Sequence, residues 1–225
     1  MAEPSSGNSI PETAMRRNPL YVTMDQHVVR ELIKAHPWAT FVSQTQVGMV
    51  ASHYPILLDE NDTEGITILT HFGRPDDTYH ELGGGEMLVI VQGPHGYISP
   101  SWYENDEFIP TWNFVTAHLH GHPEILTPDE NLAVLERLVD HFEEYVENPR
   151  SLRLDMEQAR AVAQGTVGIR IPIIRFEARQ KLSQNKSPEV IERIITQLQA
   201  EGPYRQQDLA DVMVRVNESR ISSAT

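Results

Sequence analysis

The sequence contains no cysteine and no long hydrophobic run. Its 225 residues include Cys 0, which excludes disulfides and thiolate metal ligands. No apolar stretch approaches the roughly 20 residues that a helix needs to cross a bilayer. Residues 1–18 lack the apolar segment of a signal peptide and predict a disordered N-terminal arm. We therefore expect a cytoplasmic protein that makes no contact with membranes.

Positive charge is also scarce. The chain has Lys+Arg 18 against Asp+Glu 32, a formal net charge of -14 at pH 7, which opposes direct binding to DNA or to anionic lipid. The segment 170–186 differs from the rest, because its only acidic residue is Glu177. Its cations are Arg170, Arg175, Arg179, Lys181 and Lys186. This local excess predicts a site for a phosphorylated small molecule.

The hydrophobic pattern predicts an α+β domain built around an antiparallel barrel, with peripheral helices. Strands are expected at 38–45, 49–58, 66–72, 86–92, 112–126 and 165–179. Helices are expected before Pro37, at 75–82, after Pro128, at 155–163, after Ser187 and at 206–216. Short polar connections between the first strands favour antiparallel neighbours.

Two aromatic segments stand out, residues 92–103 (QGPHGYISPSWY) and 110–114 (PTWNF). They hold two of the chain's three tryptophans, Trp102 and Trp112, among glycine, proline and serine. The first segment predicts a shaped loop whose planar side chains border a ligand pocket. The alternative is a rigid turn that covers one edge of the core. The third tryptophan, Trp38, opens an apolar strand and is expected in the core.

Polar side chains at three further places are candidates for ligand binding. The segment 181–186 (KLSQNK) combines two cations with Ser183, Gln184 and Asn185, a composition that suits an anion. His53 and His71 lie inside predicted strands beside small polar residues. Three more histidines (His118, His120 and His122) alternate along one strand. Their spacing could serve a metal or haem, but no carboxylate or thiol signature accompanies them, so a structural role is favoured and no metal is expected.

Common nucleotide and hydrolase motifs are missing. The glycines at 83–85 precede Glu86 and a strand instead of the Lys-Ser/Thr and helix of a phosphate loop. Neither a dinucleotide fingerprint nor a Gly-x-Ser-x-Gly elbow occurs. Flavin mononucleotide (FMN) needs an anion site, polar groups for its ribityl chain and flat contacts for its ring, and the segments above supply all three.

Five segments in order carry a resemblance to a known family. They are 38–42 (WATFV), 51–59 (ASHYPILLD), 92–103, 110–114 and 181–186. Together they resemble the FMN-binding negative transcriptional regulator (PaiB) family. The resemblance implies an FMN-binding split β-barrel at 19–186, a C-terminal helical extension at 187–225 packed on it, and a homodimer with FMN at the subunit interface.

The resemblance also assigns candidate cofactor-binding residues. Matching the order of strands in similar barrels gives Ser52, His53, Thr70, His71, Arg74 and Asn113, with Lys181 as an addition specific to the family. An arginine and a lysine bracket the first of these strands in the related oxidases, whereas Ser52 and Leu57 stand there in this chain, so Arg74 or Lys181 must supply the charge. The aromatic and turn residues complete the expected site: Trp102, Trp112, Ser183, Gln184 and Asn185.

Several functions are consistent with these patterns. The first is a flavin-binding or flavin-dependent redox protein, which as an enzyme would be an FMN-dependent oxidoreductase; the sequence identifies no catalytic residue for it. The second is a gene regulator that acts on DNA through a partner, since the net charge argues against direct contact. A third is a haem-binding or haem-degrading split barrel. The spectrum of the purified protein distinguishes flavin from haem.

Overall fold

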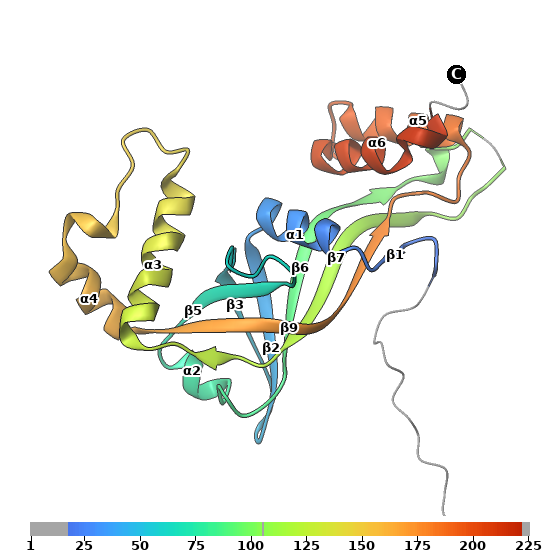
Figure 1. Ribbon diagram of the computed structural model, residues 1–225. Helices are drawn as coiled ribbons and strands as arrows, with labels where there is room; N and C mark the ends of the chain where they lie inside the picture. Colours follow the sequence, from blue (N-terminus) through green and yellow to red (C-terminus); the bar gives the residue numbers. More distant parts are fainter. Residues whose placement is uncertain (1–17, 105, 222–225) are drawn as a thin grey trace, which may run out of the picture.

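One antiparallel sheet organises the chain, and a computed structural model describes its residues 18–104 and 106–221 (Figure 1). The strands are β1 (Val22–Thr23), β2 (Trp38–Thr45), β3 (Gly48–Pro55), β4 (Leu57–Leu58), β5 (Thr67–Gly73), β6 (Met87–Ile98), β7 (Thr111–Gly121), β8 (Glu124–Ile125) and β9 (Thr166–Lys181). Their order is β3-β2-β6-β7-β9-β5-β4, and β1 and β8 also pair with β9. The N-terminal arm was predicted at 1–18, and its residues 1–17 lie outside the described ranges.

Two pairs of helices lie at the two ends of the sheet, and two further helices lie along it between them (Figure 1). They are α1 (Gln26–Ala35), α2 (Asp76–Tyr79), α3 (Pro128–Glu143), α4 (Met156–Gln164), α5 (Pro188–Gln199) and α6 (Gln207–Ile221). At one end α3 and α4 lie beside the start of β9, and at the other α5 and α6 lie beside the end of β6 and the start of β7. Within the described ranges, no helix is long and apolar enough to cross a membrane. The predicted α+β split barrel is confirmed as the fold class.

Contacts that involve side chains join β3 to β5, the place where the barrel has no backbone ladder between strands. The strand order ends at β3 on one side and at β5 and β4 on the other, and β3 and β5 are not neighbours in it. Thr70 Oγ1 donates to the Pro55 carbonyl at 2.7 Å, and the Gly73 amide donates to the Tyr54 hydroxyl at 3.1 Å. The Tyr54 ring also stacks on Phe72, with centroids 4.6 Å apart. These contacts hold the split together from the inside.

The prediction of a loop at 92–103 is wrong for most of that segment. Strand β6 continues to Ile98 and pairs with β7 on both sides of a bulge between Gln92 and His95. The bulge accommodates Pro94, which has no amide to donate to the ladder. A Cβ on Gly93 would lie 2.6 Å from Leu32 Cδ1, so glycine lets α1 approach this strand closely. The glycine and proline therefore bend a strand and do not end it.

The expectation that Trp38 lies in the core is also wrong. Its neighbours Ala39 and Phe41 are buried, whereas Trp38 is 60% exposed. Successive side chains of a strand point to opposite faces, and the register of β2 gives the inner face to Ala39 and Phe41. Trp38 lies on the other side of the sheet, where it is available to a partner.

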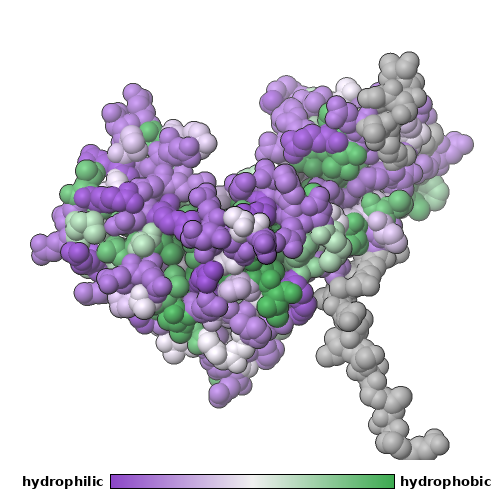
Figure 2. All heavy atoms as spheres, in the orientation of Figure 1, coloured by the Kyte–Doolittle hydropathy of each residue, from purple (hydrophilic) through white to green (hydrophobic). Residues whose placement is uncertain are grey.

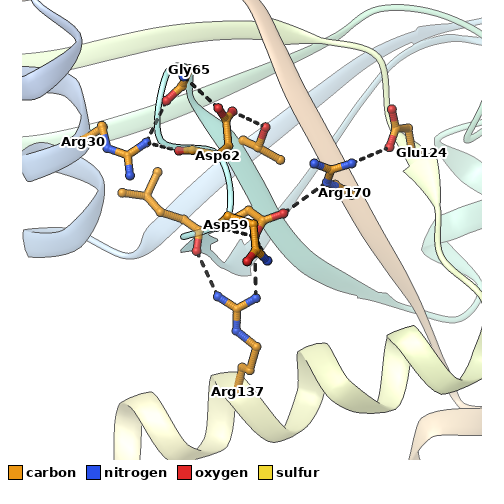
Figure 3. Close-up of polar contacts among 10 residues, drawn as sticks. Arg30, Asp59, Asp62, Gly65, Glu124, Arg137 and Arg170 are labelled. Carbon is orange, nitrogen blue, oxygen red and sulfur yellow. Dashed lines mark hydrogen bonds and ion pairs between the residues drawn. The ribbon is translucent and has the colours of Figure 1, made fainter.

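A buried carboxylate ties three elements together near the β4–β5 turn (Figure 3). Asp59 is buried and accepts from Arg170 Nε of β9 at 3.2 Å. Arg137 of α3 approaches the same carboxylate at 4.0 Å and donates to the Leu58 carbonyl at 3.2 Å. On the opposite side, Arg30 of α1 donates to the carbonyl of Gly65 at 2.7 Å. The guanidinium groups therefore anchor α1 and α3 to one turn of the sheet.

The close approach of β7 to β9 makes Gly121 sensitive to substitution. A Cβ there would lie 2.4 Å from the Pro172 carbonyl oxygen, and backbone cannot move aside as a flexible side chain can. We expect Gly121→Ala to lower the free energy of unfolding by about 1–3 kcal/mol through overpacking, measured by urea denaturation. Gly85→Ala is the matched control, since its Cβ would meet nothing within 4 Å. Equal stability of the two variants would contradict the close approach.

Candidate functional site

The residues predicted to bind the cofactor form two groups at opposite ends of the sheet. We call Ser52, His53, Thr70, His71 and Arg74 the corner group, and Trp102, Trp112, Asn113, Lys181, Ser183, Gln184 and Asn185 the aromatic group. Thr70 pairs with Ile169 near the start of β9, whereas Lys181 ends that strand. At roughly 3.3 Å per residue, about 40 Å of strand separates them. Figure 2 shows the helices of the two ends standing apart, with hydrophobic patches on the surface between them.

A carboxylate that the sequence did not indicate anchors Ser52 of the corner group. Asp76 Oδ2, at the start of α2, accepts from the hydroxyls of Ser52 and Tyr54, each at 2.7 Å. His80 continues the network, because its Nδ1 lies 2.9 Å from Ser43 Oγ and its Nε2 lies 3.0 Å from Ser52 Oγ. The alternation of β3 could have indicated Tyr54, which shares a face with Ser52. No local signal places Asp76 or His80 against them.

This network shifts the pKa values of its members. The hydrogen bonds from Tyr54 and Ser52 lower the pKa of Asp76, so the carboxylate is ionised near neutral pH. Burial, assisted by the bond to Asp76, raises the pKa of Tyr54 to about 12. Burial lowers the pKa of the His80 ring. The corner therefore holds one fixed negative charge that neutral hydroxyl donors surround.

The other corner residues have separate surroundings. Arg74 donates to Asp77 Oδ2 at 2.6 Å and, through Nε, to the Gln164 carbonyl at 3.3 Å. The hydroxyl of Thr70 is used in closing the barrel, and His53 is exposed on β3. Arg74 thus brings a cation to the corner, and Asp77 already balances its charge.

His71 differs from these because one of its polar atoms is unused. Its Nδ1 is buried and makes no hydrogen bond within residues 18–104 and 106–221. Burial lowers the pKa of the ring, which favours the neutral form. The ring meets Tyr54 edge-on at 5.8 Å. A buried ring nitrogen without a partner can accept or donate one hydrogen bond to a ligand.

A surface cavity of about 480 Å³, which we call the aromatic cavity, adjoins the aromatic group at Trp112. Trp112 is 54% exposed and lines this cavity together with Tyr97 and Tyr204. The ring of Tyr97 lies 6.1 Å from that of Trp112 and 5.7 Å from that of Tyr204. Trp102 meets Tyr204 edge-on at 6.0 Å and packs against the core behind it. Tyr204 comes from the turn between α5 and α6, which no sequence pattern connected to this site.

The polar residues of the aromatic group mostly fasten the 181–186 turn to the barrel. Asn113 is buried, and its Nδ2 donates to Ser183 Oγ at 2.9 Å. Asn185 Oδ1 accepts from the Tyr21 hydroxyl at 3.1 Å, and Gln184 Oε1 accepts from the Leu182 amide at 2.7 Å. These bonds use the side chains that the sequence suggested for an anion.

The cations of this turn lie on either side of it. Lys181 Nζ donates to Thr111 Oγ1 and, at 3.0 Å, to the Trp112 carbonyl, so its charge lies beside the aromatic cavity. Lys186 is paired with Glu107 and lies 4.6 Å from the centre of the Tyr103 ring. Lys181 is therefore the better placed of the two to meet a ligand at Trp112.

One face of the five strands β3, β2, β6, β7 and β9 combines exposed and half-buried apolar side chains with charged and polar groups. This outer sheet face carries Trp38, Thr40, Val42, Met49, His53, Leu88, Ile90, His118, Glu177 and Arg179. Met49 is 73% exposed. Glu177 Oε1 and Arg179 Nε are buried yet lack a hydrogen-bond partner in the described part of the chain. Unpaired buried polar atoms beside exposed apolar ones are typical of an interface.

Comparisons with known proteins agree with this architecture. Residues 15–175 match the family model described as "Putative FMN-binding domain". Protease synthase and sporulation protein PAI 2 of Bacillus subtilis is 30% identical over 183 residues, which cover 80% of this chain and 87% of that protein.

Two solved structures share the fold. The FAD and heme binding protein of Mycobacterium smegmatis matches with a TM-score of 0.54 and 15% identity, covering 76% of this chain and 78% of that one. The flavocytochrome Anf3 of Azotobacter vinelandii matches with a TM-score of 0.51 and 14% identity, covering 71% and 68%. At these identities the likeness establishes the fold alone.

Protonation of His80 should weaken the corner network. Because burial lowers its folded pKa below the usual value near 6.5, the unfolded chain binds this proton first as the pH falls. Stability is then lost as the pH drops from about 6.5 towards the folded pKa. We expect the free energy of unfolding of His80→Gln to fall less steeply between pH 7 and pH 5 than that of the wild type. The slope against pH should be smaller by the equivalent of up to about one bound proton. Urea denaturation across this range measures it.

The matched control for this experiment is His122→Gln, which changes an exposed histidine beyond the end of β7. This variant removes an imidazole that takes no part in the corner network, and its slope is the reference with which that of His80→Gln is compared. The comparison uses slopes, so a uniform loss of stability in His80→Gln does not affect it. If the His80 variant kept the full wild-type slope, the ring would not change its protonation between the folded and unfolded states in this range.

Proposed function

Because the chain belongs to the family of FMN-binding domains whose model matches its residues 15–175, we propose that it binds FMN and transfers electrons through the flavin. The family match carries this proposal, and the cofactor is the one that the sequence predicted. A net charge of -14 argues against direct contact with DNA. The redox role therefore takes precedence over that of a regulator that touches DNA itself.

The described side chains offer contacts to the ring, the ribityl chain and the phosphate of FMN. A cavity of about 480 Å³ walled by Tyr97, Trp112 and Tyr204 offers flat contacts to the flavin ring. Lys181 supplies a cation beside it. At the corner, Arg74 offers further donors to a phosphate, and His71 Nδ1 offers an unused hydrogen bond to a ribityl hydroxyl. The flavin supplies the redox chemistry, while these residues bind and orient it.

We further propose that two copies of the chain build each site. The two groups are too far apart to hold one FMN within a single chain. In a two-fold dimer formed through the outer sheet face, the corner group of one subunit would meet the aromatic group of its partner. The exposed Trp38 and Met49 and the unpaired atoms of Glu177 and Arg179 support this face as the interface. Such a dimer holds two equivalent composite sites.

Mixed dimers test this arrangement directly. Arg74→Gln changes the corner and Trp112→Ala changes the aromatic group, and both side chains are more than half exposed, so both variants should fold. Each homodimer should bind FMN at least about tenfold more weakly than the wild type, because both of its sites carry the change. The mixed dimer should recover one unaltered site, since one subunit contributes an intact corner and the other an intact cavity. Titration of flavin fluorescence gives the affinity and the stoichiometry.

The expected stoichiometry is one tightly bound FMN per mixed dimer and two per wild-type dimer. A mixed dimer that binds only weakly at both sites would show that each site belongs to one chain. A sedimentation mass of a single 25.5 kDa chain would overturn the dimer. A protein that binds haem, with its Soret band, and does not bind flavin would overturn the cofactor assignment.

Asp76 limits how strongly the corner can attract a phosphate. Its carboxylate already accepts from Ser52 and Tyr54, which are the donors that an incoming anion would use. Asp77 balances Arg74 in the same way. The corner thus has an internal anion where the related oxidases carry cations. We infer that Asp76 competes with the FMN phosphate and keeps the affinity moderate.

Substitution of this carboxylate should therefore strengthen the binding of FMN. Asp76→Asn removes a unit charge that costs about 1 kcal/mol at 4 Å in water, so we expect roughly a fivefold lower Kd for FMN. Riboflavin lacks the phosphate, and its Kd should change less. Asp211→Asn, on the exposed side of α6, is the control variant. An equal change for FMN and riboflavin would show that Asp76 does not act on the phosphate.

A further inference from the structure

A second cavity, of about 400 Å³, lies between α3, α4 and the start of β9. It is separate from the aromatic cavity and shares only Arg74 with the residues assigned to FMN. The volume lies within the range of small-molecule sites. Both helices that wall it come from the segment between β8 and β9. The FMN proposal gives this segment no role.

Specific contacts hold the cavity open. Asn131 of α3 is buried, and its Nδ2 donates to the Ala163 carbonyl at 3.1 Å and to Thr166 Oγ1 at 3.0 Å. These bonds fix α3 to the end of α4. A Cβ on Gly168 would lie 2.8 Å from Asn131 Cα, so glycine is needed for α3 to lie this close to β9. The walls are therefore fixed on three sides before any ligand enters.

The walls are mainly apolar. Leu126, Leu132, Ala163 and Val167 line the interior. Ile125 lines it too and remains 57% exposed, so a large apolar side chain faces solvent unless something covers it. Burial of such surface stabilises a bound molecule by about 25 cal/mol per Å². The cavity therefore suits the apolar body of a ligand.

Two guanidinium groups mark one side of the opening. Arg74 and Arg160 both line the cavity, and the backbone carbonyl of Gln164, one turn after Arg160 on α4, accepts from Arg74 Nε at 3.3 Å. Arg160 is exposed, and no carboxylate pairs with it within the described ranges. Asp77 balances Arg74, and Asp129 of α3 adds one negative charge to the lining. The lining is therefore close to neutral, which disfavours a phosphate dianion, while Arg160 can still pair with one negative charge on a ligand.

We propose that this cavity binds a small organic acid, with its carboxylate on Arg160 and Arg74 and its apolar body against Leu132, Ala163 and Val167. Arginine pairs with carboxylates through parallel hydrogen bonds, and the apolar walls lie behind this pair. The ligand class is a monocarboxylate with an aromatic or aliphatic tail. The site is independent of the proposed flavin site except at Arg74, through which a bound acid can influence the corner.

Calorimetric titration with 4-phenylbutyrate tests the proposal, with the uncharged 4-phenylbutanamide as the matched ligand. The wild type should bind the acid at one site per chain and the amide at least tenfold more weakly. Arg160→Gln should remove this preference, because it deletes the cation and keeps the polar side chain. Arg205→Gln, which changes an exposed arginine in the turn before α6, should leave both affinities unchanged. Ala163→Leu fills the apolar part and should abolish the binding of both ligands.

The outcomes separate this site from the flavin site. Flavin affinity measured on the same variants should be unchanged in Arg160→Gln, so loss of acid binding there is not loss of FMN binding. Failure of the wild type to bind the acid, or equal affinities for acid and amide, would overturn the proposal. Unchanged binding in Ala163→Leu would place the acid elsewhere. Unfolding curves of each variant confirm that the protein is folded in the titration.

Discussion

The backbone ladder of β9 is the constraint on which the rest of the structure depends. Its first residues pair with β5 up to Pro172, and from Ile173 onward it pairs with β7. Pro172 has no amide to donate, and it stands where the strand passes from one partner to the other. A single strand therefore joins both halves of the sheet, and its length sets the distance between the corner group and the aromatic group.

Electrostatic pairing explains why the basic segment does not form a groove. Arg170 meets Asp59, Arg175 meets Glu86, and Lys186 meets Glu107. Arg175, Arg179 and Lys181 lie an even number of residues apart and therefore share one face of β9, but the pairing of Arg175 with Glu86 interrupts the row of positive charge. In a chain with a net charge of -14, carboxylates are available to pair with such cations. The groups that remain for a ligand lie at the ends of the sheet.

The dimer that we propose would account for both the outer sheet face and the separation of the two site groups. Apolar side chains such as Trp38 and buried polar atoms such as Glu177 Oε1 are stable only when a second surface meets them. A second copy of the chain would provide that surface and would bring opposite ends of two sheets together. The same geometry leaves the cavity between α3 and α4 with its own opening, at the side of the barrel where Arg74 links it to the corner.

The sequence by itself determined the elements and the family, because hydrophobic periodicity and segment motifs are local properties. It predicted β2, β5 and β9 and the amphipathic helices closely. Tertiary structure alone decided that 92–103 is a bulged strand, that Trp38 faces outward and that Asp76 meets Ser52 and Tyr54. It also divided the predicted site residues between two ends of the sheet. Register, long-range hydrogen bonds and pairing of charges depend on which strands become neighbours, and that information lies in no single segment.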